Sequence, residues 1–140
     1  MRKTTTTLLA TLVFCLLAPA SSFACKCAQP PAPKEALKQA AAVFTGKVTK
    51  IERDPKYGKI IHLTVSKQWK GVDKQTVTVK TGLGGGDYGY GFQKDKIYLV
   101  YCHGKKELST NICTRTKPLA KAKKDLEELG PPKEPGKPSS

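Results

Sequence analysis

The sequence predicts a mainly β domain: a five-stranded OB-like Greek-key barrel with a short helix at each end. Three observations lead to this fold class. Short segments of alternating apolar and polar residues recur along the chain and are separated by turn residues. The first of them contains Gly46, which is typical of a bend in a strongly coiled sheet. Helix-forming segments flank the strands. Other small five-stranded barrels share this pattern and remain open as alternatives.

The chain begins with a predicted signal peptide, residues 1–24. Arg2 and Lys3 precede an apolar run from Leu8 to Leu17, and small residues follow up to Ala24, as a signal peptidase site requires. The apolar run has about half of the roughly 20 residues needed to cross a bilayer, so no transmembrane segment is predicted. We expect a secreted protein, or a periplasmic one in a Gram-negative bacterium.

Cleavage after Ala24 makes Cys25 the first residue of the mature chain. A thiol or disulfide, a free α-amine and a carbonyl group then lie within a few ångströms of one another at the chain terminus. A lipidated Cys25 is an alternative, although lipoprotein leaders usually have leucine where this chain has Ser22.

The mature chain of 116 residues is long enough for one small domain. An even number of cysteines in a small exported chain predicts two disulfides. Cys25 and Cys27 cannot readily bond each other, so both must reach the C-terminal half, and two pairings stay open. A structural zinc is the alternative for the same four residues: Cys25, Cys27, Cys102 and Cys113.

The mature chain carries 23 basic and 11 acidic residues, a net charge of +12. Such a charge suits an anionic cell surface or polysaccharide, whereas export argues against a nucleic acid partner. The lysines are spread along the whole chain, which is also typical of a merely solvated surface. His62 and His103 are 41 residues apart without a nearby carboxylate motif, and there is no phosphate-binding motif. We therefore predict no enzyme activity and no cofactor.

The first predicted elements follow a proline-rich entry at residues 28–33. Residues 34–41 contain good helix formers and predict a short helix. Residues 43–51 predict a strand that bends at Gly46, and residues 54–58 predict a turn. Residues 60–69 alternate, which is typical of a half-buried strand, and residues 75–81 alternate again.

The glycine-rich segment 82–91 holds six glycines and two tyrosines. A phosphate-binding loop would be followed by a helix. Residues 96–102 predict a strand instead, so we interpret segment 82–91 as a mobile loop. A turn at residues 103–105 leads into the last predicted strand, residues 107–113.

A C-terminal helix is predicted from Thr116, a plausible N-cap, with Pro118 in its first turn. Gly130 is expected to end it. The domain therefore spans residues 25–130, and residues 131–140 predict a disordered tail. One face of the helix carries apolar residues at helical spacing: Leu119, Ala122, Leu126 and Leu129.

Three parts of the mature chain share the pattern of a known family. The first is Cys25-Lys26-Cys27 with prolines shortly after it, and the second is VFTGKV at 43–48. The third comprises YGYGF at 88–92, KIYLV at 96–100 and STNICTRTKP at 109–118. In these parts the chain resembles the netrin-like domain family, and specifically the inhibitory domain of the tissue inhibitors of metalloproteinases. The chain departs from the family at Gln29, where the family has proline.

The resemblance implies disulfides Cys25–Cys102 and Cys27–Cys113. The family's partner of its first cysteine precedes the Gly-Tyr of the third part, where this chain has Asp87, so Cys102 would replace it. The third disulfide and the C-terminal domain of the vertebrate proteins are absent. Asp87, Tyr88 and Tyr90 lie where the family has a contact loop.

The resemblance also implies a secreted inhibitor of zinc metalloproteases. The α-amine and carbonyl of Cys25 would chelate the catalytic zinc of the target and displace its water. Lys26 would project into the pocket for the substrate residue after the scissile bond, where the family has a small or hydroxylated residue. The alternative is a non-inhibitory netrin-like module that binds a polyanion or partner protein through its basic surface. The predicted protease contacts are Lys26, Cys27, Ala28, Gln29 and Pro30.

Overall fold

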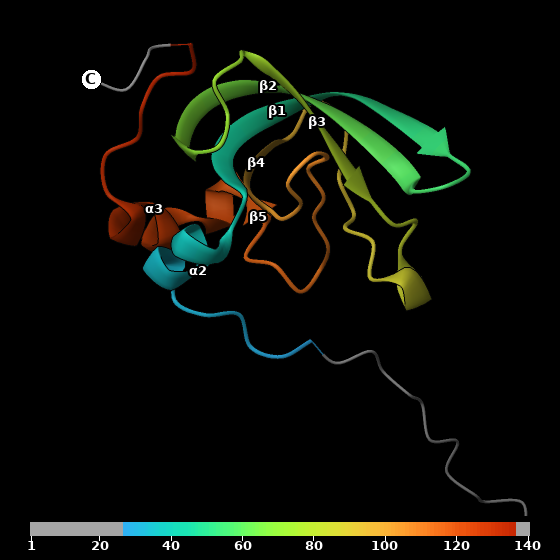
Figure 1. Ribbon diagram of the computed structural model, residues 1–140, viewed down its shortest axis with the longest axis horizontal. Coiled ribbons are helices and arrows are strands. Elements are labelled where there is room, and N and C mark those ends of the chain that lie inside the picture. The colour runs from blue at the N-terminus through green and yellow to red at the C-terminus, as the bar shows by residue number, and fades with distance from the viewer. Residues whose placement is uncertain (1–26, 137–140) are drawn as a thin grey trace, which may run out of the picture.

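The fold is mainly β: a five-stranded antiparallel sheet with a short helix near each end of the chain (Figure 1). The computed structural model describes residues 27–136. The strand order in the sheet is β3-β2-β1-β4-β5. The elements are α2 (Pro33–Gln39), β1 (Ala42–Asp54), β2 (Gly58–Lys70), β3 (Thr76–Thr81), η2 (Gly85–Asp87), β4 (Ile97–Cys102), β5 (Lys117–Pro118), η3 (Leu119–Lys121) and α3 (Lys123–Leu129).

Strands β1 and β2 form a long curved hairpin of 13 residues each (Figure 1). The pairing register shifts at three places along it, one of them between Thr45 and Gly46. A Cβ atom at Gly46 would lie 3.2 Å from the Leu63 Cβ and from the Thr64 carbonyl oxygen. A side chain at this position would make its neighbours move by a few tenths of an ångström, so glycine fits best here. The register shift beside Gly46 agrees with the predicted bend or bulge.

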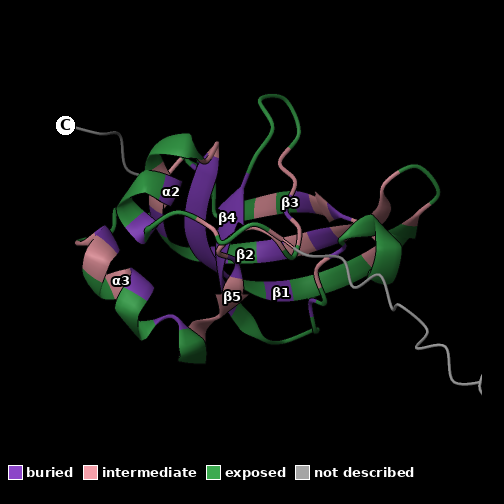
Figure 2. Ribbon diagram, turned by 90° about the horizontal axis from the view of Figure 1, so that it is seen from below, coloured by how far each residue is buried: buried purple, intermediate pink, exposed green. Residues whose placement is uncertain are grey.

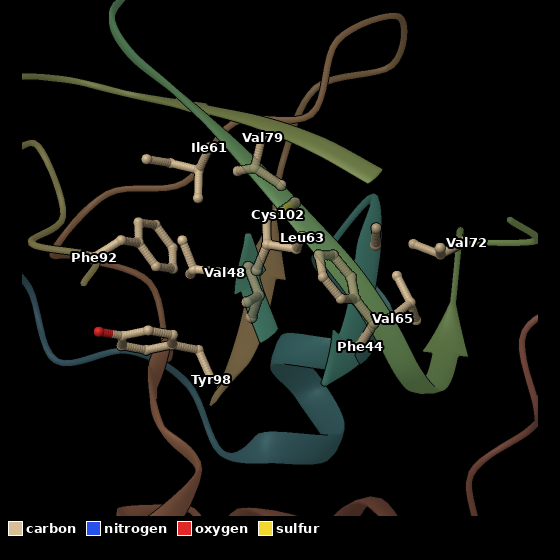
Figure 3. Packing of buried hydrophobic residues seen from close by; sticks show 12 residues of the cluster. Phe44, Val48, Ile61, Leu63, Val65, Val72, Val79, Phe92, Tyr98 and Cys102 are labelled. Carbon is tan, nitrogen blue, oxygen red and sulfur yellow. The ribbon is translucent and has the colours of Figure 1, made fainter. Parts of the chain in front are cut away.

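Both faces of the middle of the sheet are buried. An inner cluster lies inside the curve of the sheet and includes Phe44, Leu63, Phe92, Tyr98 and Cys102 (Figure 3). Because successive strand residues point to opposite faces, neighbouring residues face the two helices instead. These form an outer cluster: Ala36, Val43, Leu99, Tyr101, Ala122 and Leu129. Strand β4 serves both clusters and is buried along most of its length (Figure 2).

The sheet is not closed into a barrel, which corrects that part of the predicted fold. The predicted last strand, residues 107–113, is also wrong. It is reduced to two bridges at Ser109, an antiparallel one to His103 and a parallel one to Lys80 on β3. The fifth strand of the sheet is β5, which pairs with Tyr98 and Leu99 of β4.

The C-terminal helix starts later than predicted. Thr116 is buried and is not an N-cap, because its hydroxyl accepts a hydrogen bond from the Tyr101 amide of β4 at 3.0 Å. The turn η3 follows β5, and α3 then ends at Gly130, whose φ of 75° suits glycine, as predicted. The predicted apolar helix face lies in the outer cluster.

Residues 131–140 were predicted to be a disordered tail. In the structure, the Lys133 backbone exchanges two hydrogen bonds with Gln68 of β2, of 2.7 and 3.0 Å. The chain therefore stays on the domain surface at least to Lys133. None of the helices in residues 27–136 has the length and apolar character needed to cross a membrane.

Candidate functional site

The candidate site is the segment that enters the domain before α2. Cys25 and Lys26 lie outside the described residues, so the structure shows the segment from Cys27 onward. Cys27 forms a disulfide with Cys113, and their Cα atoms are 5.1 Å apart. This pairing was predicted, and the structure contains it. Ala28 and Gln29 are exposed next to the bond, and Pro30 is half-buried.

Arg115 holds the same segment at a second point. Its Nη1 donates a hydrogen bond of 3.0 Å to the carbonyl oxygen of Pro31. Its Nε and Nη2 donate to the two carboxylate oxygens of Asp125 on α3, at 2.8 and 2.9 Å. One guanidinium group thus joins the N-terminal segment to the C-terminal helix.

Asp125 is the charged centre of this arrangement and is only 2 % exposed. It also accepts hydrogen bonds from the Lys117 ammonium at 2.8 Å and from the Tyr101 hydroxyl at 3.2 Å. Burial would raise the pKa of Asp125, but the hydrogen bonds from Arg115 and Lys117 outweigh it and hold the pKa below its usual value. Asp125 is therefore ionised at neutral pH and fixes both cations.

Hydroxyl groups hold the loop that carries Cys113. The Thr110 hydroxyl donates to the Tyr101 carbonyl at 2.8 Å and lies 2.9 Å from the hydroxyls of both Thr114 and Thr116. The Cys113 amide donates to the Asn111 side chain at 2.9 Å. The loop is therefore fixed to β4 on one side and to Cys27 on the other.

A small cavity of about 260 Å³ lies beside the disulfide. Its lining includes Pro30, Pro31, Ala36, Tyr101, Cys102 and Cys113. Cys102 has no disulfide partner within residues 27–136, is 2 % exposed and belongs to the inner cluster (Figure 3). Burial raises the pKa of this thiol to about 12, so it is protonated and a poor nucleophile at neutral pH. Because Cys25 is outside the described residues, the Cys25–Cys102 disulfide stays a prediction.

The glycine-rich loop is more structured than its composition predicts. The Asp87 carboxylate accepts hydrogen bonds from the backbone amides of Leu83, Gly84 and Gly89, at 2.6, 2.8 and 3.1 Å. The hydrogen bonds from Gly84, Gly89 and Leu83 lower the pKa of Asp87. Asp87 thus closes the loop around η2.

Two further contacts place this loop. The Tyr90 ring packs against Phe92, with ring centroids 4.7 Å apart, and burial raises the pKa of its hydroxyl to about 12. The carbonyl oxygen of Tyr88 accepts a hydrogen bond of 3.0 Å from the amide of Ile112, the residue before Cys113. The structure therefore brings the predicted contact loop to the loop that holds Cys27.

Exposed apolar side chains mark this side of the molecule. Tyr88 is 36 % exposed, Ile112 is 45 % exposed and Leu83 is 48 % exposed. Tyr88 and Leu83 belong to the glycine-rich loop, whereas Ile112 neighbours the disulfide. Ile51 and Ile97 are exposed to a similar degree on β1 and β4. What distinguishes Tyr88 and Ile112 is that a backbone hydrogen bond joins them next to the disulfide.

The two histidines lie apart from each other. His62 is on β2, where its Nε2 contacts the Glu52 carboxylate at 2.5 Å. His103 is exposed directly after β4 and lines the cavity beside the disulfide. Within residues 27–136, no group of His, Cys, Asp and Glu side chains could hold a metal ion. Comparison of the chain with models of known protein families and with curated proteins finds no match.

Sequence reasoning missed Arg115, Asp125 and Ile112. Arg115 and Asp125 are ten residues apart. Arg115 lies in the segment 109–118 that carries the family resemblance, but nothing in that segment pointed to an ion pair with Asp125. The available signal was an acidic residue among the apolar positions of the C-terminal helix, since a carboxylate on a buried helix face needs a cationic partner.

Proposed function

We propose that the protein is a secreted inhibitor of zinc metalloendopeptidases. The α-amine and carbonyl oxygen of Cys25 ligate the catalytic zinc of the target in a five-membered chelate and displace the water that attacks the peptide bond. An α-amine has a pKa near 8, so its neutral form is accessible at physiological pH, and zinc binding favours that form.

The observation that carries this proposal is the double attachment of the N-terminal segment. Cys27 is bonded to Cys113, and the Pro31 carbonyl is held by Arg115. An extended chain places the Cα atom of Cys25 within about 7 Å of that of Cys27. The segment from Cys27 to Pro31, fixed at both points, would lose little conformational freedom when it enters an active-site cleft, which favours tight binding.

The surroundings of the segment also support an inhibitor. Tyr88 and Ile112 expose apolar surface and are joined by a backbone hydrogen bond. A protease contact made by Lys26 to Pro30 would extend over these residues. Lys26 itself probes the pocket after the scissile bond, and a lysine there selects targets whose pocket is deep or polar.

We assign the domain to the netrin-like, OB-like class. The order β3-β2-β1-β4 and the parallel bridge from Lys80 to Ser109 support this assignment. In a Greek-key barrel of this type the last strand would lie between β3 and β4. Ser109 makes a bridge to each side of that gap.

One alanine added before Cys25 tests the chelation directly. The extension moves the α-amine away from the zinc and puts a peptide group in its place, while the disulfide and sheet stay intact. Inhibition of a sensitive metalloprotease should fall by orders of magnitude, and carbamylation of the amine should act alike. The matched control is one alanine added after Ser140, which should inhibit like the parent.

Equal inhibition by the two extended proteins would show that direct chelation is wrong, and the non-inhibitory binding module would then be the better account. Mass spectrometry of the exported protein gives a second test. A mature terminus other than Cys25, or an acylated Cys25, removes the chelating amine and overturns the proposal.

A further inference from the structure

Three segments that are distant in sequence meet at the free end of the β1–β2 hairpin, which projects away from α2 and α3 (Figure 1). The Tyr57 hydroxyl in the hairpin turn donates a hydrogen bond of 3.2 Å to Glu107. Lys80 of β3 pairs with Glu107, and its Nζ lies 3.3 Å from the Tyr57 ring centroid. The hairpin turn, the end of β3 and the loop before Glu107 are therefore fixed together.

This region gathers cations that the sequence shows only as scattered residues. We call the following five the basic end: Arg53, Lys56, Lys59, Lys105 and Lys106. Within residues 27–136, none of the five forms an ion pair. Arg53 and Lys59 are directly opposite each other across the hairpin. Like charges in this position repel each other and destabilise a sheet, so folding alone does not explain them.

The nearby carboxylates have other partners. The Asp54 carboxylate accepts hydrogen bonds from the backbone amides of Lys56 and Tyr57, at 2.9 and 2.8 Å, and thereby stabilises the hairpin turn. The Asp87 carboxylate accepts hydrogen bonds from three backbone amides, and Glu107 forms an ion pair with Lys80. The Lys56 Nζ lies 4.8 Å from the Tyr57 ring centroid. Within residues 27–136, no cation of the basic end is paired with a carboxylate, so the charges of the basic end are available to an external anion.

An open hollow of about 740 Å³ lies between the hairpin end and the glycine-rich loop. Arg53 and Lys56 line it together with Tyr57 and the exposed Leu83. Asp54 and Asp87 line it as well, and both carboxylates accept hydrogen bonds from backbone amides. A ligand in the hollow would therefore meet the two cations on the hairpin side and Leu83 on the loop side, next to carboxylates that are already hydrogen-bonded.

We propose that the basic end binds an anionic polysaccharide, at a site separate from the zinc-chelating terminus. Four of the five cations are lysines. A lysine ammonium is a point charge on a flexible stem, whereas an arginine guanidinium is a planar group suited to bidentate binding of one carboxylate. Two of the cations, Arg53 and Lys56, line the hollow, and the others lie on the hairpin and in the loop before Glu107. Charges spread over separate segments in this way suit a polymer with repeated anionic groups. Export by the predicted signal peptide would favour such a polymer over a nucleic acid.

Binding to heparin, a sulfated polysaccharide, tests the site with two triple variants of equal net charge. The first is Arg53→Gln, Lys59→Gln and Lys106→Gln. The control is Lys121→Gln, Lys123→Gln and Lys124→Gln, at exposed positions in η3 and α3. We expect the first variant to bind heparin about tenfold more weakly or worse and to elute at lower salt, while the control stays close to the parent.

Equal weakening in both variants would mean that net charge alone drives binding, and the proposed site would be wrong. The parent can also be tested with polyglutamate as a model of an acidic protein. If the same residues bind polyglutamate more tightly than heparin, the partner is an acidic protein and the proposal of a polysaccharide ligand is wrong. A melting temperature of the first variant at or above that of the parent shows that lost binding is not unfolding, since the variant relieves the Arg53–Lys59 repulsion. Inhibition by both variants should equal that of the parent, which separates this site from the proposed inhibitory one.

Discussion

Arg115 joins the N-terminal segment to the C-terminal helix through hydrogen bonds. Its guanidinium group donates to Asp125 in α3 through two nitrogens and to Pro31 in the N-terminal segment through the third. A planar group with donors in fixed directions can satisfy all three acceptors at once. Lysine, with one ammonium group on a flexible stem, cannot reproduce that geometry.

We therefore expect Arg115→Lys to lower the free energy of unfolding by about 1 to 3 kcal/mol, because hydrogen bonds to a buried charge are lost. Urea denaturation measures the change. Arg53→Lys is the control, because Arg53 is exposed and lies outside this network, and it should change the free energy by less than about 0.5 kcal/mol. An equal effect of the two substitutions would show that the fork geometry is unimportant.

Asp125 should make the protein sensitive to acid. A carboxyl group whose pKa is lower in the folded than in the unfolded chain contributes stability above its unfolded pKa, near 3.9, and the contribution disappears as the pH falls through the folded pKa. Asp125→Asn leaves Arg115 and Lys117 without their anion and should cost about 3 to 5 kcal/mol at pH 7.

Thermal unfolding from pH 7 down to about pH 3 checks this expectation, since the range spans the unfolded pKa of aspartate. The parent should lose stability more steeply than Asp125→Asn below about pH 4, because only the parent has this carboxylate to protonate. Parallel curves for the two proteins would contradict the assignment.

At the scale of elements, the sequence predicted α2, the first four strands and the end of α3, because each has a local pattern: alternation, helical spacing or a terminating glycine. It could not predict the region from residue 107 to 118. Residues 107–113 alternate weakly, but Asn111 turns the chain back on itself, with its side chain bonded to the Cys113 amide. Thr116 has the residue type of an N-cap, but its partner is across the sheet at Tyr101.

The candidate site divides in the same way. The disulfide Cys27–Cys113 followed from family resemblance and the position of the cysteines. The Arg115–Asp125 pair did not, because a contact between two loops or helices leaves no periodic signal in the sequence. Asp87 was expected in a mobile loop, whereas its carboxylate holds three amides of that loop.

Asp87→Ala should therefore loosen the glycine-rich loop without unfolding the sheet. Its three amide partners, Leu83, Gly84 and Gly89, lose their acceptor, and their hydrogen exchange should accelerate. Exchange measured by NMR reports each amide separately. Amides of β1 and β2 should keep their rates, and the exposed control Asp73→Ala should change neither set. Unchanged rates at the three loop amides would mean that backbone geometry alone fixes the loop.

For the whole molecule, the Cys27–Cys113 bond is the largest single constraint, since it joins residues 86 positions apart. The chain-entropy model assigns about 4 to 5 kcal/mol to a loop of this length. Cys27→Ser with Cys113→Ser should lower the free energy of unfolding by that amount in urea denaturation. Adding a thiol reductant to this double variant should lower its free energy of unfolding further only if the Cys25–Cys102 disulfide also forms, because no other disulfide is then left to reduce. Non-reducing peptide mapping of the parent identifies that second bond independently.

In the outer cluster, α2 and α3 pack on the same face of β1 and β4. Helix α2 comes from the start of the described chain and α3 from near its end. A ribosome completes α2 long before it completes α3. Until then Val43, Leu99 and Tyr101 lack the cover that α3 provides on their helix side. A product that stops before residue 113 would keep part of this apolar surface exposed and would also lack the cysteine that pairs with Cys27. The domain thus distinguishes complete from incomplete copies of itself, and incomplete ones carry the features that chaperones and proteases recognise.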